Sequence, residues 1–330
     1  MKVAVDWRWI RDDGIGRFMK GVISHSRDSF VPLRPPMSIF NPLEQIWLST
    51  HLLTASYNLY FSPSINPPLF SNIPFVFVIH DLIPLRFSKE SSLPKKVYYR
   101  TVLRLAVKRA HRILTVSEFS KDEIINWTNL NPERVVVVGN GVDSRFCPDG
   151  NMHDPGGPYL LYVGNTRPHK NVAAAIEGYA RSGMADEVKL VLSGSPTSEL
   201  NDVIQEHDVE DCVEFADFIP EDELPAYYRG ATALLHPSLY EGFGLPVLEA
   251  LACGTAVVAS NATAIPEVTG DAAHLFDPTN IGEIASAMRK VVLDDSFRMS
   301  LEQRGPERAK KFSWEGVARR TESALRAAVA

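Results

Sequence analysis

Short apolar runs alternate with longer segments of helical periodicity along most of the chain. In the first half, the runs that read as buried strands are 2–6, 58–61, 75–79, 113–116 and 135–138. In the second half they are 159–163, 189–192, 213–215, 233–235, 256–259 and 274–276. Runs rich in Val, Ile and Leu that alternate with helices are typical of parallel sheets covered on both faces. The pattern therefore predicts an α/β protein with two doubly wound units.

Proline and glycine mark the breaks in this pattern. Residues 31–42 contain four prolines and are predicted to form a loop. Gly14 and Gly16 are predicted to form a tight turn before a helix. Residues 143–158 are rich in both residue types and read as a linker. We therefore predict one domain over 1–150 and a second over 151–330, and leave open whether the last helix packs back on the first.

Composition sets the broad class. The chain has 330 residues, of which 45% are hydrophobic and 22% charged, and this is ordinary globular usage. No apolar run approaches the roughly 18 residues of a spanning helix. The first residues lack the apolar region of a secretory signal, and three widely spaced cysteines suit a reducing compartment. A cytoplasmic protein is expected.

Charge is distributed unevenly between the halves. Residues 1–150 hold 19 Lys and Arg against 13 Asp and Glu, whereas residues 151–330 hold 15 against 27. Two readings stay open: chance variation between solvated domains, or a basic half that faces an anionic partner such as a membrane surface.

The most informative stretch runs from Pro237 to Glu249 and directly follows a predicted strand. Gly242 and Gly244 allow a ligand to approach the backbone closely, and Pro246 suits the first turn of a short helix. The N–H groups at the start of such a helix bind phosphate well. Glu241 and Glu249 suit hydroxyl groups, so the stretch predicts a nucleotide-sugar site. The alternative is a glycine-rich turn with two solvated acids.

Three further loops follow predicted strands. Arg167 and Lys170 lie where cations can neutralise a leaving diphosphate. Gly14 and Gly16 match only two of the three glycines of a dinucleotide fingerprint, and His80 with Asp81 ends another strand. The alternatives are ordinary solvated charges for the first loop, a plain tight turn for the second and a structural histidine for the third. The chain has no Asp-x-Asp pair and no metal-ligand spacing, and nucleic-acid motifs are missing.

These residues resemble the retaining glycosyltransferases of family 4, which have the two-domain GT-B fold. The segment from Glu241 to Glu249 resembles the family's E-x7-E signature, and 116–121, 140–143, 164–171 and 251–255 agree with it. His80 to Pro84 resembles a subgroup that includes many bacterial mannosyltransferases. The resemblance implies two Rossmann-like domains that face a central cleft.

The resemblance also implies roles for individual residues. The catalytic residues would be His80 beside the hexose, Lys170 at the diphosphate and Glu241 at the donor sugar. The residues implied in donor binding are Gly14, Gly16, Arg167, Lys170, Ile219, Glu241, Gly242, Phe243, Gly244, Leu245 and Glu249, the last at the ribose. One departure is His169, where many members have Arg, and Arg167 is the candidate to replace that charge.

The implied reaction moves a hexose, with mannose the first choice, from a nucleoside diphosphate to an acceptor hydroxyl and retains the anomeric configuration. The acceptor would be a glycan or a lipid-linked sugar. No metal or other cofactor is required, because cations and the helix N-terminus supply the charge. Two alternatives are a sugar-nucleotide epimerase of the same fold and a catalytically silent subunit that binds a nucleotide-sugar or glycan.

A basic segment in the first half suggests one more partner. Cations recur every four residues over 96–112 of a predicted helix, and no acid occurs from Ser92 to Val116. An ordinary core helix with a solvated basic face explains the apolar positions of this segment. Because family members often act on lipid-linked acceptors, we also expect weak contact of the 95–112 helix with anionic lipid at the inner membrane face.

Overall fold

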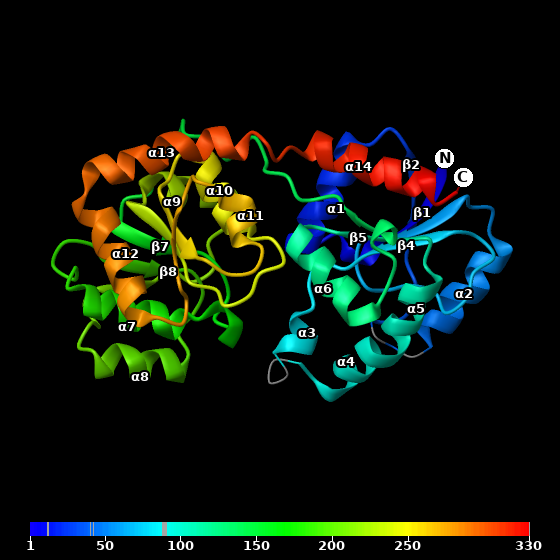
Figure 1. The fold of residues 1–330 in the computed structure, drawn as a ribbon, viewed down its shortest axis with the longest axis horizontal. Helices are drawn as coiled ribbons and strands as arrows, with labels where there is room; N and C mark the ends of the chain where they lie inside the picture. The colour runs from blue at the N-terminus through cyan, green and yellow to red at the C-terminus, as the bar shows by residue number, and fades with distance from the viewer. Residues whose placement is uncertain (12, 40, 42, 88–90, 330) are drawn as a thin grey trace. The chain divides into compact units, whose positions relative to one another are not determined.

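The structure is a computed structural model that describes every residue except 12, 40, 42, 88–90 and 330. The chain forms two compact units (Figure 1). The first unit consists of Met1–Gly141 together with Phe312–Ala330, and the second of Val142–Lys311.

The first unit contains a sheet of six parallel strands in the order β2-β1-β3-β4-β5-β6. The strands are β1 (Lys2–Asp6), β2 (Ser29–Leu33), β3 (Leu59–Ser62), β4 (Phe75–Val78), β5 (Arg112–Thr115) and β6 (Val135–Val137). Successive side chains of a strand point to opposite faces. Tyr60 and Phe77 therefore belong to one core, and Phe61 and Val78 to another.

Helices cover both faces of this sheet. They are η1 (Trp7–Trp9), α1 (Gly14–His25), α2 (Glu44–Thr54), α3 (Ile83–Arg86), α4 (Leu93–Tyr98), η3 (Tyr99–Leu103), α5 (Arg104–Arg109), α6 (Glu118–Thr128), η4 (Pro132–Arg134) and α14 (Trp314–Ala327). Residues of α2, α4, α5 and α6 complete the core around Tyr60. Residues of α1 and α14 complete the core around Phe61.

The last helix, α14, belongs to the first unit. A Cβ atom at Gly21 would lie 2.3 Å from carbons of the Trp314 ring, so α1 carries glycine where the indole packs. The unit boundary lies at Gly141 and not at residue 150, because residues after 141 contact the second unit. Arg229, for example, donates hydrogen bonds to the carbonyls of Cys147 and Asn151.

Three local predictions for the first unit were wrong. Residues 29–33 form β2, which overlaps the start of the loop predicted over 31–42, and Pro32 is tolerated because β2 is an edge strand. Gly14 and Gly16 lie in the first turn of α1, because the Asp13 side chain accepts a hydrogen bond from the Gly16 N–H at 2.8 Å. The helix predicted over 95–112 is α-helical up to Tyr98, π-helical over η3 and α-helical again over α5, which ends at Arg109.

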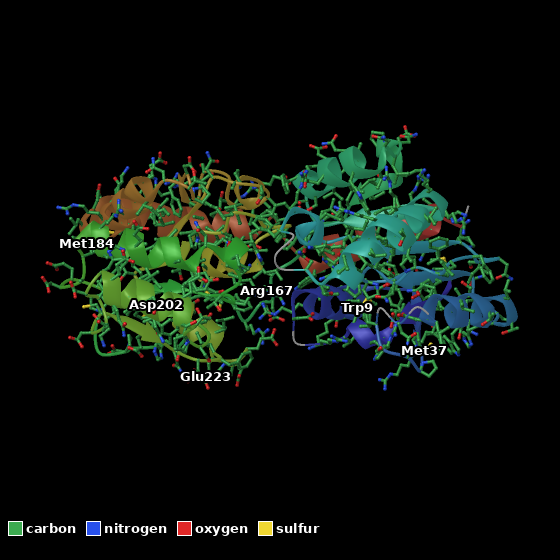
Figure 2. The ribbon with its side chains drawn as sticks, turned by 90° about the horizontal axis from the view of Figure 1, so that it is seen from below. Trp9, Met37, Arg167, Met184, Asp202 and Glu223 are labelled. Carbon is green, nitrogen blue, oxygen red and sulfur yellow. The ribbon has the colours of Figure 1, made fainter. Side chains whose placement is uncertain are left out.

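A polar network anchors the segment after β1. Arg8 pairs with the buried carboxylates of Asp6 and Glu44 and donates to the Met37 carbonyl at 2.8 Å. The Trp9 indole donates to Asn66 Oδ1 at 3.0 Å. Trp9 and Met37 are labelled in Figure 2. The network joins η1 to α2 and to the loop after β3, so it holds the carboxyl ends of β1 and β3 in place.

The second unit has its own sheet of six parallel strands, in the order β12-β11-β10-β7-β8-β9. The strands are β7 (Tyr159–Tyr162), β8 (Lys189–Leu192), β9 (Val213–Phe215), β10 (Ala233–His236), β11 (Val257–Ser260) and β12 (His274–Phe276). The predicted strands match these closely. Because β10 is the neighbour of β7, the loops that follow these two strands meet at one edge.

The helical elements of the second unit are η5 (Pro168–Lys170), α7 (Val172–Ser182), α8 (Ser198–Glu206), α9 (Leu224–Gly230), α10 (Leu245–Ala252), α11 (Ile265–Thr269), α12 (Ile281–Leu293) and α13 (Asp295–Ala309). Figure 1 shows α7, α8 and α12 on one side of the sheet and α9, α10 and α11 on the other. Among the described residues, none of the helices of either unit has the length and apolar character that crossing a bilayer requires.

Candidate active site

An ion pair joins the loops that follow β7 and β10. The Lys170 ammonium, at the end of η5, lies 2.7 Å from Glu241 Oε1. Both side chains are largely buried, with 13% and 10% of their surface exposed. Separate roles are predicted for these two residues from the sequence, and the sheet brings them into contact although 71 positions separate them.

His236, the last residue of β10, also contacts Glu241. Its Nε2 lies 2.9 Å from Glu241 Oε1, and its side chain is completely buried. Burial opposes the ionised form of Glu241. The charge of Lys170 and the hydrogen bond from His236 outweigh this effect and hold the pKa of Glu241 well below its usual range. Glu241 is therefore a carboxylate at neutral pH.

Hydrogen bonds fix both loops against each other. The Leu239 N–H donates to the His169 carbonyl at 2.8 Å, and the Glu241 N–H donates to Thr263 Oγ1 at 2.9 Å. The Asn171 side-chain amide donates to the carbonyls of Pro237 and Pro278. The position of Glu241 is thus set by contacts of its backbone as well as of its carboxylate.

The chain turns sharply into α10 after Glu241. Gly244 has φ +98°, and a Cβ atom there would lie 2.6 Å from Ile265 Cδ1, so both conformation and space favour glycine. Pro246 lies in the first turn, as predicted, and Gly254, with φ +74°, follows the C-terminus of the helix. Gly242, Phe243, Gly244 and Leu245 therefore bring the first N–H groups of α10 next to Glu241.

Glu249 lies inside α10 and is 3% exposed. Its Oε2 accepts a hydrogen bond from the Tyr228 hydroxyl at 2.9 Å. The Tyr228 carbonyl in turn accepts from Thr255 Oγ1 at 2.7 Å. The carboxylate of Glu249 is therefore held by α9 in a fixed orientation, and its contact with a ribose stays a prediction.

Two further residues of the second unit, Arg167 and Ile219, are predicted donor contacts. Arg167, labelled in Figure 2, is exposed, and its backbone N–H donates to Asn165 Oδ1 at 3.1 Å. No ion pair of its side chain occurs among the described residues, and its contact with a diphosphate stays a prediction. Ile219 is buried in the loop after β9.

The remaining predicted residues belong to the first unit. A Cβ atom at Gly16 would lie 1.9 Å from the Arg11 carbonyl oxygen, so packing within the unit already requires this glycine. Gly14 begins α1. His80 follows β4, and its Nε2–H donates to the Pro63 carbonyl at 2.9 Å. Burial lowers the pKa of His80, which favours a neutral ring with its proton on Nε2. Donor contacts of these three residues stay predictions.

Sequence reasoning missed two residues of the cluster, His236 and Tyr228. A polar residue that ends an apolar strand was the signal that singled out His80, and the same signal applies to His236. Tyr228 had no comparable signal, since an aromatic residue on a short helix usually marks a core position. No group of three or more His, Cys, Asp or Glu side chains suited to a metal occurs within the described part of the chain.

Two family models together match most of the chain. Residues 146–308 match the model described as "Glycosyl transferases group 1", and residues 13–146 match the model described as "Glycosyltransferase Family 4". The first match contains Lys170, Glu241 and Glu249, and the second contains Gly14, Gly16 and His80.

Curated relatives agree with these matches. The chain is 33% identical over 243 residues to "O-antigen chain mannosyltransferase B" of Escherichia coli, an alignment over 69% of this chain and 64% of the relative. It is 30% identical to "Alpha-maltose-1-phosphate synthase" of Mycolicibacterium smegmatis, over 77% of this chain and 73% of that protein. The match to "Serotype-specific mannosyltransferase WbdA" of Escherichia coli, at 29% identity, spans 75% of this chain but only 33% of the relative.

Solved structures share the fold. HepE of Anabaena, in complex with UDP-glucose, superposes with a TM-score of 0.80 at 19% identity over 99% of both chains. Sucrose-phosphate synthase from Thermosynechococcus elongatus gives a TM-score of 0.76 at 17% identity over 98% of both chains. Taken with the family models and the two parallel sheets, these findings show that the chain belongs to family 4 of the glycosyltransferases and has the GT-B fold.

Proposed function

We propose that this protein transfers mannose from GDP-mannose to a hydroxyl of a glycan or lipid-linked acceptor, with retention of the anomeric configuration. The observation that carries the proposal is the pair of buried carboxylates after β10: Glu241 beside Lys170, and Glu249 bonded to Tyr228. Such a pair suits a ligand with hydroxyls on both sides of a diphosphate. The names of several relatives support mannose as the sugar.

Positive charge on the protein would stabilise the transition state of the transfer. The Lys170 ammonium and the first N–H groups of α10 would stabilise the negative charge that develops on the leaving diphosphate. Glu241 would accept a hydrogen bond from a hydroxyl of the hexose. The acceptor would attack from the face that the diphosphate leaves, and the diphosphate would take the acceptor's proton. In this scheme no metal ion is needed.

A nucleotide screen tests the donor part of the proposal. A ligand that binds only the folded protein raises the melting temperature, and a concentration of 100 times Kd stabilises by about 2.7 kcal/mol. GDP should therefore raise the melting temperature by several degrees, and more than UDP or ADP. The shift should be the same with EDTA present. A larger shift with UDP would contradict GDP as the nucleotide of the donor. A shift that EDTA abolishes would contradict binding without a metal ion.

We further propose peripheral contact with anionic membranes through the 95–112 segment. Arg100, Arg104 and Lys108 are exposed on η3 and α5, whereas Arg112 begins β5 and does not extend the helical row. The neighbouring helix α4 exposes Leu93, at 73%, and α5 exposes Leu105, at 55%, which allows shallow apolar contact. Each cation near such a surface contributes about 1 kcal/mol.

Vesicle co-sedimentation tests this contact. We expect binding to anionic vesicles and not to neutral ones, with a loss at high salt because the charges are screened. Changing Arg100, Arg104 and Lys108 to Glu should abolish it. The same change at the exposed residues Lys310, Lys311 and Arg319 is the matched control. Equal binding to both kinds of vesicle, or equal losses in the two variants, would overturn the proposal.

A further inference from the structure

Two hydrogen-bond donors converge on a single oxygen of Glu241. Lys170 Nζ lies 2.7 Å from Oε1, and His236 Nε2 lies 2.9 Å from the same atom. No hydrogen bond to Oε2 occurs among the described residues, and the Glu241 side chain keeps 10% of its surface exposed. The carboxylate therefore has one oxygen committed to the protein and one left for a ligand hydroxyl.

The imidazole of His236 makes its polar contacts through Nε2, and the shorter of them is with Glu241. A proton must lie on Nε2 for the ring to donate to a carboxylate, so the ring has the Nε2–H tautomer. Its Nδ1 is buried and has no hydrogen-bond partner within the described residues. Ser238 Oγ is the other polar atom near Nε2, at 3.3 Å. A buried strand thus ends in a polar ring whose one strong interaction is with Glu241.

We propose that His236 is a positioning residue that holds Glu241 Oε1 in place and presents Oε2 to the hexose of the donor. The inference rests on the proposed function. Lys170 is also the cation proposed to face the diphosphate, so the Lys170–Glu241 bond weakens when the donor binds. The His236–Glu241 bond does not compete with the donor, and it keeps the carboxylate oriented at that moment.

Other groups around Glu241 do not duplicate this role. Thr263, before α11, accepts a hydrogen bond from the Glu241 backbone N–H, and in the part of the chain that the structure describes its hydroxyl makes no hydrogen bond to the carboxylate. Tyr162, on β7, is close enough for the charge of Glu241 to contribute to its raised pKa, but its hydroxyl donates to the Asn165 carbonyl at 2.6 Å. With Lys170 engaged by phosphate, His236 is the remaining donor to Oε1.

The test compares His236→Phe with His236→Gln. Phenylalanine keeps the ring but removes the donor, whereas the glutamine amide places an N–H near the position of Nε2. His274→Phe, on β12 of the same unit, is the matched control, because His274 packs against Phe297 and not against Glu241. Slow hydrolysis of GDP-mannose without acceptor is the rate that is measured, and GDP affinity is measured separately.

His236→Phe should lower the hydrolysis rate about 10-fold or more, since a hydrogen bond to a charged group is lost. GDP affinity should change less than twofold, because GDP has no hexose for Glu241 to contact. His236→Gln should recover most of the rate, and His274→Phe should resemble the wild type. Equal losses of rate and of GDP affinity, or no recovery in His236→Gln, would mean that His236 acts only in folding.

A double-mutant cycle with Glu241→Gln shows whether His236 acts through Glu241. If it does, His236→Phe lowers the rate of the Glu241→Gln variant by less than twofold; independent, multiplying losses would overturn the inference. The same cycle on the free energy of unfolding requires no donor. If wild-type protein does not hydrolyse GDP-mannose, the proposed function fails, while coupling in the unfolding cycle still reports whether His236 holds Glu241.

Discussion

Lys170→Ala is expected to lower the rate of sugar transfer about 100-fold or more. Removal of one group that stabilises developing negative charge typically has this effect. Lys170 lies in the loop after β7 and is not part of the hydrophobic core of the second unit, so the variant should keep its fold. Lys189→Ala is the matched control, because Lys189 forms a more exposed pair with Glu214, 3.8 Å apart.

The ion pair adds a second consequence to this substitution. Without Lys170, the buried carboxylate of Glu241 keeps only His236 as a side-chain partner among the described residues, and removing one member of a buried pair destabilises by roughly 3–5 kcal/mol. Adding Glu241→Gln should restore much of the stability, because the buried charge is then gone, but none of the activity. Near-normal transfer by Lys170→Ala, measured as steady-state GDP release, would exclude Lys170 from the leaving-group site.

Glu249→Ala is expected to weaken nucleotide binding about 10–100-fold. A hydrogen bond between a carboxylate and a ribose hydroxyl contributes about 1.5–3 kcal/mol, and every 1.4 kcal/mol is a factor of ten in Kd. Tyr228→Phe is the control, because it removes the hydroxyl that donates to Glu249 at 2.9 Å but keeps the carboxylate.

Titration with GDP and with its 2′,3′-dideoxy analogue separates ribose recognition from a packing defect. Wild type and Tyr228→Phe should both prefer GDP strongly. Glu249→Ala should bind the two ligands about equally. If Glu249→Ala still prefers GDP as strongly as the wild type does, Glu249 does not recognise the ribose and serves the fold of α10 alone.

The strands of both units could be predicted well because their apolar runs are buried on both faces of a parallel sheet. Strand β8, for example, occupies exactly the predicted residues 189–192. The edge strand β2 could not be predicted in this way. Pro32 indicates a loop when the local sequence is considered alone, and a strand tolerates it here only because β2 lies at the edge of the sheet. The π-helical turn at Tyr99–Leu103 likewise has no signal in the four-residue spacing of the cations.

Prediction of the site was limited in the same way. The motif reading found Lys170 and Glu241 as separate residues, each after a strand. Their ion pair depends on β10 lying beside β7, an arrangement that follows from sheet order and not from the order of strands along the chain. His236 ends an apolar strand, as His80 does, but its contact with Glu241 depends on how the loop after β10 folds back, which the local sequence does not show.

We propose that this chain itself cleaves a nucleotide-sugar with retention of the anomeric configuration. The direct measurement is to incubate wild-type protein with GDP-α-mannose without acceptor, to follow GDP release, and to identify the first mannose anomer by NMR. We predict slow release of GDP together with α-mannose as the initial product. β-Mannose as the initial product would contradict retention. No release of nucleotide from GDP-mannose, or from UDP- and ADP-sugars tested in the same way, would contradict the claim that this chain is a transferase.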